Sequence, residues 1–302
     1  MRRRGVLGGL LTVGVLSLGV TANQPQDEMV VQIEQLEGNL FVLRGGGGNS
    51  AAFVTSDGVV LVDTKVPGWG QPLIDKIGEL TPNPVTTIIN THTHFDHVSG
   101  NVEFPATVDV VAHEHTQRLM REWNEITGFN FAGEDVFAAN NGRGIATRTF
   151  ADRMTLGSGA DQVDLYYFGR GHTGGDAWVV FPSLRVMHAG DMFPGKQVPV
   201  LDANNGGSGV DFSETLIKSH TTLTDIDTII TGHSTQMTRD DLREYAEFMR
   251  DLVAAVREAK GAGRSVDDIA NTWEVPSSYT GYATPTSDGL RPWVQVIYDE
   301  LP

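Results

Sequence analysis

The sequence contains no cysteine among its 302 residues. Without thiols there are no disulfide bonds, no structural zinc modules built on cysteine, and no thiolate ligand or nucleophile. Basic residues are also scarce: 22 lysines and arginines stand against 38 aspartates and glutamates, which gives a formal net charge of −16. Because this surplus repels nucleic acid and anionic membrane surfaces, a nucleic-acid partner and a nuclease role are disfavoured.

Long hydrophobic runs are missing as well, except at the N-terminus. Three arginines at positions 2–4 precede an apolar segment, residues 5–20, which small residues follow up to Ala22. This segment is short for a membrane span, for which about 20 apolar residues are needed. The pattern is typical of a secretory signal peptide over residues 1–22, so we expect a periplasmic or secreted protein without stable membrane insertion after cleavage. An uncleaved anchor is the alternative.

Histidine is concentrated in one segment, residues 91–100, which reads THTHFDHVSG and holds three of the nine histidines. The β-branched, apolar run before it predicts a buried strand that ends where the histidines begin. Residues two apart in extended backbone point the same way, so His92 and His94 could reach one metal ion together. Asp96 and His97 would face the same cavity from the following turn. Imidazole and carboxylate ligands suit zinc, with iron or manganese as alternatives.

Three more expected strand ends present a histidine or an aspartate beside glycines, namely His172, Asp191 and His233. The strands expected before them cover residues 164–168, 184–188 and 228–231. In layered α/β folds such ends gather at one edge of the sheets, so these side chains are expected near the histidine-rich segment.

Other patterns predict the remaining elements. Strands are expected at 30–34, 39–43, 51–55, 59–63, 108–112 and 177–181, and helices at 71–80, 114–123 and 242–260. Two capping boxes, at 238–241 and 265–268, indicate helix starts. Residues 45–49 are expected to form a flexible turn, and the irregular segment 125–149 is the candidate for shaping a substrate pocket.

The polar residues outside the main motifs have simpler interpretations. Asp63 ends an apolar strand and is either a partner of a metal-binding histidine or an ordinary turn residue. His113 and His115 are expected to cap or pack. His188 is expected in the core or behind the metal layer, and His220 at the surface.

Four motifs, THTHFDH, GRGHTGGD, HAGD and TGH, resemble in this order and spacing the metallo-β-lactamase superfamily over roughly residues 29–257. The resemblance implies an α/β fold, a four-layer αβ/βα sandwich, in a single domain over residues 23–302. It also implies two zinc ions at one edge of the paired sheets. The implied ligands are His92, His94 and His172 for the first ion, Asp96, His97 and His233 for the second, and Asp191 for both.

The residue at position 191 separates this chain from some members of that superfamily. The best-known zinc β-lactamases have a cysteine where Asp191 stands. An aspartate there is the arrangement of glyoxalase II, of lactonases and of many other hydrolases. β-Lactam specificity is therefore in doubt, although some aspartate-bridged relatives open lactams.

The expected function is that of an exported dinuclear zinc hydrolase. A hydroxide bridging the metals would attack a carbonyl group of a small uncharged or cationic molecule, either an amide, a lactam, a lactone, an ester or a thioester, with Asp96 handling a proton. The alternatives are a mononuclear iron oxygenase similar to persulfide dioxygenases, a phosphodiesterase, and a metal-holding binding protein without turnover. Two zinc ions per chain would favour hydrolysis, whereas one iron with oxygen uptake would overturn it.

Overall fold

The computed structural model describes residues 30–129 and 131–302. The expected signal peptide, residues 1–22, lies outside the described residues, so its presence stays a prediction. Within the two described ranges, every helix is too short or too polar to cross a membrane.

The first sheet has seven strands in the order β1 to β7. Its strands are β1 Gln32–Glu37, β2 Leu40–Arg44, β3 Ser50–Val54, β4 Val59–Val62, β5 Val85–Ile89, β6 Asp109–His113 and β7 Arg148–Phe150. β1 to β4 pair antiparallel, and β4 to β7 pair parallel. All four residues of β4 are buried, as expected for a strand covered on both faces.

The second sheet has five strands in the order β12-β11-β10-β9-β8. Its strands are β8 Arg153–Leu156, β9 Val163–Tyr166, β10 Trp178–Phe181, β11 Val186–His188 and β12 Thr228–Ile230. β8 to β11 pair antiparallel, and β11 and β12 pair parallel. The short edge strands β7 and β8 were not predicted, because runs of three and four residues are too short for apolar alternation to distinguish a strand from a loop.

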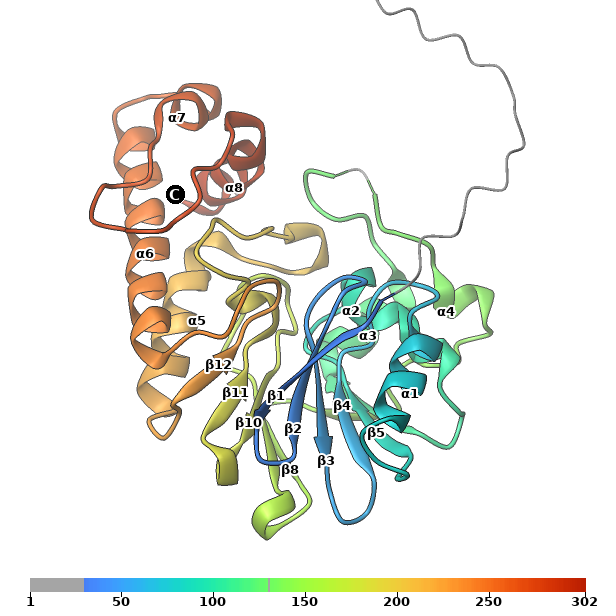
Figure 1. Cartoon of the computed structure of the whole chain (residues 1–302). Helices are drawn as coiled ribbons and strands as arrows, with labels where there is room; N and C mark the ends of the chain where they lie inside the picture. Colours follow the sequence, from blue (N-terminus) through green and yellow to red (C-terminus); the bar gives the residue numbers. More distant parts are fainter. Residues whose placement is uncertain (1–29, 130) are drawn as a thin grey trace, which may run out of the picture.

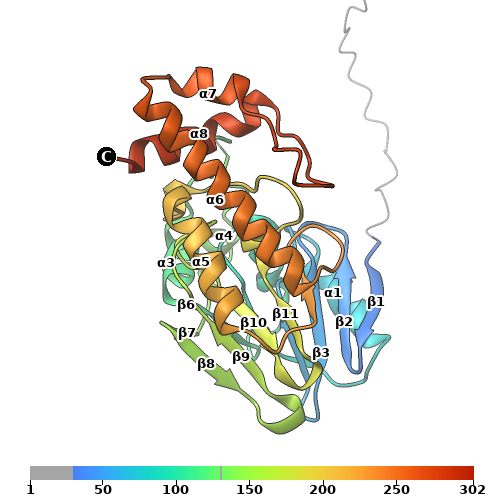
Figure 2. The ribbon, with the colours of Figure 1, turned by 90° about the vertical axis from the view of Figure 1, so that its left-hand side faces the viewer.

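The two sheets pack face to face, with Phe53 of β3 against Phe181 of β10 at 5.1 Å between ring centroids. Helices cover both outer faces (Figures 1 and 2). Beside the first sheet lie α1 Gly70–Gly78, α2 Phe95–Val98, α3 Glu114–Glu122 and α4 Val136–Ala139. The helices of the other side are α5 Gly209–Thr222, α6 Arg239–Gly261, α7 Val266–Thr272 and α8 Ser287–Glu300. The predicted four-layer αβ/βα sandwich is confirmed.

Both predicted capping boxes are present at the helix starts. The Thr238 side chain accepts from the backbone of Asp241, whose carboxylate accepts in return, and Ser265 and Asp268 repeat the arrangement. Short 3₁₀ segments connect other elements; these are η1 Ser99–Glu103, η2 Gly159–Asp161, η3 Pro182–Leu184, η4 Gly190–Met192 and η5 Ala203–Asn205. The helices α5 and α8 were not predicted individually.

The glycine-rich segment 45–49 differs from its expected description as a flexible turn, because it is closely packed. A Cβ on Gly47 would lie 2.6 Å from the carbonyl oxygen of Asp96, and one on Gly48 would lie 2.2 Å from the His97 ring. The Gly48 amide also donates to the Asp96 carbonyl oxygen at 3.2 Å. The segment therefore lies directly against two residues of the histidine-rich motif.

Candidate metal centre

The histidine-rich segment starts at the edge where β5 ends. His94 has extended backbone, and α2 begins with the next residue, so the chain turns sharply within the motif. The side chains of His92 and His94 are 1% and 5% exposed. The Thr91 amide donates to Asp63 Oδ1 at 2.8 Å and fixes the start of the segment on the end of β4.

Connections of the second sheet bring the other predicted residues to the same edge. β9, β11 and β12 run in one direction, because β10 is antiparallel to both β9 and β11, and β11 is parallel to β12. His172, Asp191 and His233 follow the C-terminal ends of these three strands. Gly232 leaves room for Asp191, since a Cβ there would lie 1.9 Å from the carboxylate.

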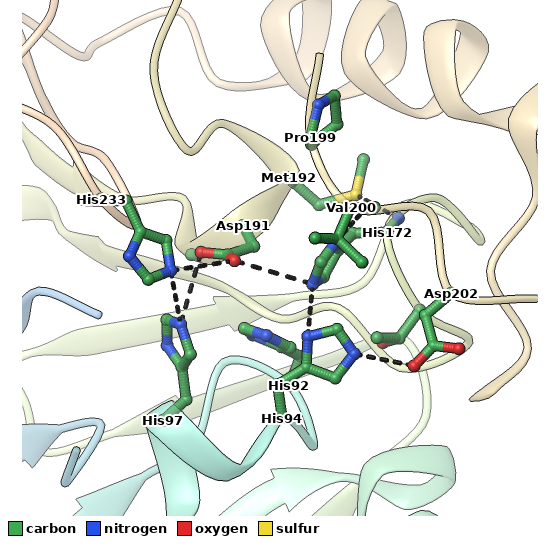
Figure 3. A network of polar contacts seen from close by, with 12 residues as sticks. His92, His94, His97, His172, Asp191, Met192, Pro199, Val200, Asp202 and His233 are labelled. Carbon is green, nitrogen blue, oxygen red and sulfur yellow. Dashed lines mark hydrogen bonds and ion pairs between the residues drawn. The ribbon is translucent and has the colours of Figure 1, made fainter. Parts of the chain in front are cut away.

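The structure gathers all seven predicted residues into two adjoining groups. Figure 3 labels six of them, all except Asp96. Within each group, one candidate ligand atom of every residue lies within 4.8 Å of those of the others. The first group is His92, His94, His172 and Asp191, and the second is Asp96, His97 and His233. The structure thus places together residues up to 141 positions apart, although their role as ligands stays a prediction.

The first group is fully buried and compact. His94 Nδ1 and His172 Nε2 lie 3.0 Å apart, and Asp191 Oδ2 is 3.7 Å from His172 Nε2. The His92 ring lies 4.6 to 4.8 Å from the rings of the other two histidines, measured between centroids.

The second group is more open and shares Asp191 with the first. His97 Nε2 lies 3.3 Å from His233 Nε2, and Asp191 contacts both rings at 3.4 Å and 3.1 Å. The Asp96 carboxylate is 3.6 Å from His97 and 3.4 Å from His233. The side chains of Asp96 and His233 are 18% and 33% exposed, so solvent reaches the centre from this side.

Hydrogen bonds at the outer ring nitrogens fix which nitrogens of the first group face inward. His94 Nε2 donates to Asp202 Oδ2 at 2.8 Å, and His172 Nδ1 donates to the Val200 carbonyl oxygen at 2.6 Å. Both facing nitrogens, 3.0 Å apart, then carry lone pairs, and two lone pairs at this distance repel unless a cation lies between them.

His92 follows the same rule, and His97 also donates from its outer nitrogen. Thr91 donates its hydroxyl hydrogen to Asp63 Oδ2 and so accepts from His92 Nδ1 at 3.0 Å, which leaves His92 Nε2 as the lone-pair nitrogen. His97 Nδ1 donates to Asp63 Oδ2 at 2.7 Å. Among the described residues, His92 Nε2 and Asp191 Oδ1 are buried without a hydrogen-bond partner. Such orphaned acceptors at the centre fit a metal ion.

The histidine pKa values are shifted in opposite directions in the two groups. Burial, together with the neighbouring histidines, lowers the pKa of His92 well below its usual value and that of His172 to about 4, so both imidazoles are neutral at pH 7. Burial also lowers the pKa of His97, but Asp96 and Asp191 outweigh it and raise that pKa well above its usual range. The second group therefore attracts positive charge, either a proton or a cation.

Two carboxylates accept hydrogen bonds from the outer ring nitrogens of histidines in the centre. Asp63, considered as a partner of a metal-binding histidine, does contact His97 and Thr91. Asp202, which contacts His94, was missed by the sequence analysis because it belongs to none of the motifs. Its only signal is an aspartate ahead of Asn-Asn-Gly-Gly, a pattern that an ordinary turn shares.

The remaining histidines serve the scaffold. His113 caps α3, and His115 contacts the Gly174 carbonyl oxygen at 2.8 Å, beside the turn that carries His172. His188 is buried and donates to the Asn49 carbonyl oxygen at 3.0 Å, which connects the second sheet to the glycine-rich segment. These positions agree with the predicted capping and packing roles. His220, predicted at the surface, is half-buried on α5.

The family model of the metallo-beta-lactamase superfamily matches residues 43–233, which include the whole candidate centre. The chain belongs to the metallo-beta-lactamase superfamily. The match ends at His233, so α6, α7 and α8 lie beyond it.

Curated relatives of this superfamily member are distant. The chain is 24% identical over 243 residues to the 2,4-dinitroanisole O-demethylase subunit alpha of Nocardioides sp. (strain JS1661), an alignment covering 79% of this chain and 68% of the relative. It is 27% identical over 190 residues to the metallo-beta-lactamase type 2 of Elizabethkingia meningoseptica, covering 58% of this chain and 68% of the relative. The two relatives carry names of different activities, so they do not identify a substrate.

Solved structures agree on the fold. The metallo-beta-lactamase from Pontibacter korlensis matches with a TM-score of 0.60 at 18% identity, covering 73% of this chain and 99% of that chain. The DIM-1 metallo-beta-lactamase matches with a TM-score of 0.58 at 16% identity, covering 73% and 97%. At such identities the likeness extends to the fold alone.

Proposed function

We propose that this superfamily member is an exported, dinuclear zinc hydrolase of small uncharged or cationic molecules. The observation that carries the proposal is the set of inward lone pairs on His92, His94 and His172, each fixed by a hydrogen bond at the opposite ring nitrogen. Such an arrangement has high energy without a cation and low energy with one.

Seven residues would hold the ions. The proposed ligands are His92, His94 and His172 for one ion, Asp96, His97 and His233 for the other, and Asp191 between them. Two bound dications would lower the pKa of a shared water towards neutrality and polarise the carbonyl group of a substrate. The neutral imidazoles of the buried group preserve the charge of the ions, and the aspartates offset part of it.

Asp96 is the residue proposed to move a proton. Its carboxylate lies on the open side of the centre and within 3.6 Å of both His97 and His233. From there it can accept a proton from the attacking water and return it to the leaving group. A proton carrier must lie within hydrogen-bond distance of the reacting group. A substrate can come this close only at the solvent-exposed side, where Asp96 lies, because buried side chains close the first group.

The substrate class follows from charge and from the relatives. A net charge of −16 disfavours polyanionic substrates, which supports a small carbonyl compound over a nucleic acid. The metallo-beta-lactamase relative keeps lactams among the candidates. The relative named an O-demethylase adds an activated aryl methyl ether to the compounds worth testing.

The test is a hydrolase panel with the zinc-loaded chain lacking residues 1–22. The panel contains nitrocefin, a lactone, a thioester, nitrophenyl esters, 2,4-dinitroanisole and a phosphodiester, and metal content is measured by mass spectrometry. We expect two zinc ions per chain and turnover of at least one carbonyl substrate. A His172→Ala variant is the control, in which turnover should fall to background. One iron per chain with oxygen uptake, or turnover of the phosphodiester alone, would contradict the proposal.

A further inference from the structure

Two phenylalanine side chains are left in water beside the candidate centre. Phe129 is 60% exposed and Phe131 is 53% exposed, and within the described residues only Val30 is a comparably exposed large apolar residue. Leaving side chains of this size in water forgoes the free energy that their burial would contribute. Exposed aromatic side chains that lie close to a candidate centre are candidates for a binding surface.

The described residues around them, 125–129 and 131–133, are here named the aromatic turn. Ile126 and Phe131 form an antiparallel bridge, and the Ile126 amide donates to the Phe131 carbonyl oxygen at 2.9 Å. The indole of Trp123 donates to the Gly133 carbonyl oxygen at 3.3 Å. These contacts fix the backbone of Phe131 against Ile126 and that of Gly133 against Trp123, while the side chains of Phe129 and Phe131 stay exposed.

The aromatic turn lies against the metal-binding motif. The Phe131 ring meets the Phe95 ring edge-on at 5.4 Å between centroids, and Phe95 stands between His94 and Asp96 in the sequence. A Cβ on Gly133, whose φ is +75°, would lie 2.8 Å from Phe95, so glycine permits this close approach. In Figure 1 the segment between α3 and α4 extends past the end of the sheets where α2 lies.

One carboxylate connects the aromatic turn to the centre. Asp202 Oδ1 accepts hydrogen bonds from the amide and the hydroxyl of Thr127, both at 3.0 Å, while Oδ2 accepts from His94 Nε2 at 2.8 Å. The Asn204 amide donates to the Thr127 hydroxyl at 2.9 Å. The position of the turn and the orientation of His94 therefore depend on the same side chain.

We propose that Phe129 and Phe131 bind an aromatic or branched apolar group of an uncharged substrate, next to the carbonyl group that the centre attacks. This role as a substrate surface rests on the proposed hydrolase function. Glu125 at the start of the turn, and Glu134 and Asp135 directly after it, repel an anionic substrate. Through Phe131 this surface continues to Phe95, the residue before Asp96 in the sequence.

The test compares two double variants, in which both residues 129 and 131 are changed. Phe→Ser at both positions removes the apolar surface, and Phe→Leu at both keeps it without the rings. The substrates are nitrophenyl phenylacetate and nitrophenyl acetate, which share a leaving group. We expect the ratio of kcat/KM for phenylacetate over acetate to fall about tenfold in the serine variant and less than threefold in the leucine variant, mainly through KM. An unchanged ratio in the serine variant would overturn the inference.

A binding measurement separates this inference from the hydrolase proposal. Saturation-transfer NMR with phenylacetamide, and acetamide as control, reports binding without turnover. A binding signal that wild type shows and the serine variant loses supports the substrate surface, whether or not an ester is cleaved. If no ester is cleaved, that result contradicts the hydrolase proposal and leaves the surface intact. The same two phenylalanines could instead contact a second copy of this chain, which analytical ultracentrifugation tests. A wild-type dimer together with a monomeric serine variant would overturn the substrate surface in favour of that contact.

Discussion

The carboxylate of Asp202 accepts a hydrogen bond from Nε2 of His94 over a distance of 2.8 Å. Burial alone would raise the pKa of Asp202, but the hydrogen bond and charge interaction with His94 outweigh burial and lower that pKa to about 2. The side chain is therefore a carboxylate at neutral pH, and it selects the tautomer of His94 whose Nδ1 faces the centre.

Replacing Asp202 with asparagine should weaken zinc binding. The hydrogen-bond partners of Asp202 are all donors, namely His94 Nε2, the amide and hydroxyl of Thr127, and the amide and side chain of Asn205. An asparagine amide group would face a donor in either orientation. We expect zinc affinity to fall about 10- to 100-fold, measured by competition with a chromophoric chelator. Asp211→Asn, at an exposed carboxylate paired with Arg170, is the matched control and should leave affinity unchanged.

Replacing Asp96 with alanine should abolish turnover while part of the metal remains. The buried group of His92, His94, His172 and Asp191 does not include Asp96, so at least one zinc ion per chain should stay bound. Loss of the proposed proton carrier should lower kcat by at least about 100-fold. Metal analysis and steady-state kinetics on the same preparation check both parts. A variant that keeps the wild-type rate would show that another group moves the proton.

Gly48 should tolerate no side chain, because the His97 ring occupies the space that a Cβ would need. A Cβ there would lie 2.2 Å from the His97 ring, so Gly48→Ala must displace either the glycine-rich segment or a proposed ligand. We expect a loss of at least about 2 kcal/mol in unfolding free energy, as for other overpacked sites, together with the loss of one zinc ion. Gly78→Ala is the control: it ends α1, has open space around its Cβ, and should be neutral or stabilising by up to about 1 kcal/mol. Equal urea midpoints for the two variants would contradict the packing argument.

Lys65 should make stability depend on pH. Its side chain is fully buried, and its ammonium group donates to the carbonyl oxygens of Leu43 and Gly48. Burial lowers its pKa to about 7, against the attraction of Asp63. Between pH 7 and the unfolded-state pKa of about 10.5, the unfolded chain binds more protons, so the free energy of unfolding rises with pH.

The measurement that isolates this effect compares wild type with Lys65→Met. Between pH 7 and pH 9, urea titrations should show the wild-type advantage growing by roughly 1 to 3 kcal/mol, since one pH unit corresponds to about 1.4 kcal/mol for a full proton. Across the whole range the variant should be less stable, because two buried carbonyl oxygens lose their donor. A constant difference between the two proteins from pH 7 to pH 9 would show that Lys65 keeps its proton when folded.

Much of the fold could be predicted because the chain carries strong local signals. The apolar run that forms β5, the capping box at Thr238 and the strands β3 and β4 all appear in the structure close to their expected bounds. The edge strands β7 and β8 and the helix α5 could not be predicted in the same way. Their residues are polar or mixed, and they become ordered through pairing with neighbours that are distant in sequence.

The site, like the fold, has features with local sequence signals and features that depend on contacts between residues distant in sequence. Residue order alone was enough to predict which side chains gather. His92 and His94 follow one expected strand end, and three further ends present His172, Asp191 and His233 beside glycines. Strand direction brings such ends to one edge. Only the tertiary structure decided which ring nitrogens face the centre and what lies beside it. Asp202 and Thr127 are 75 residues apart and belong to no motif, and their contact exists because two connections meet at that edge. Hydrogen-bond direction depends on the positions of atoms in space, which residue order alone does not specify.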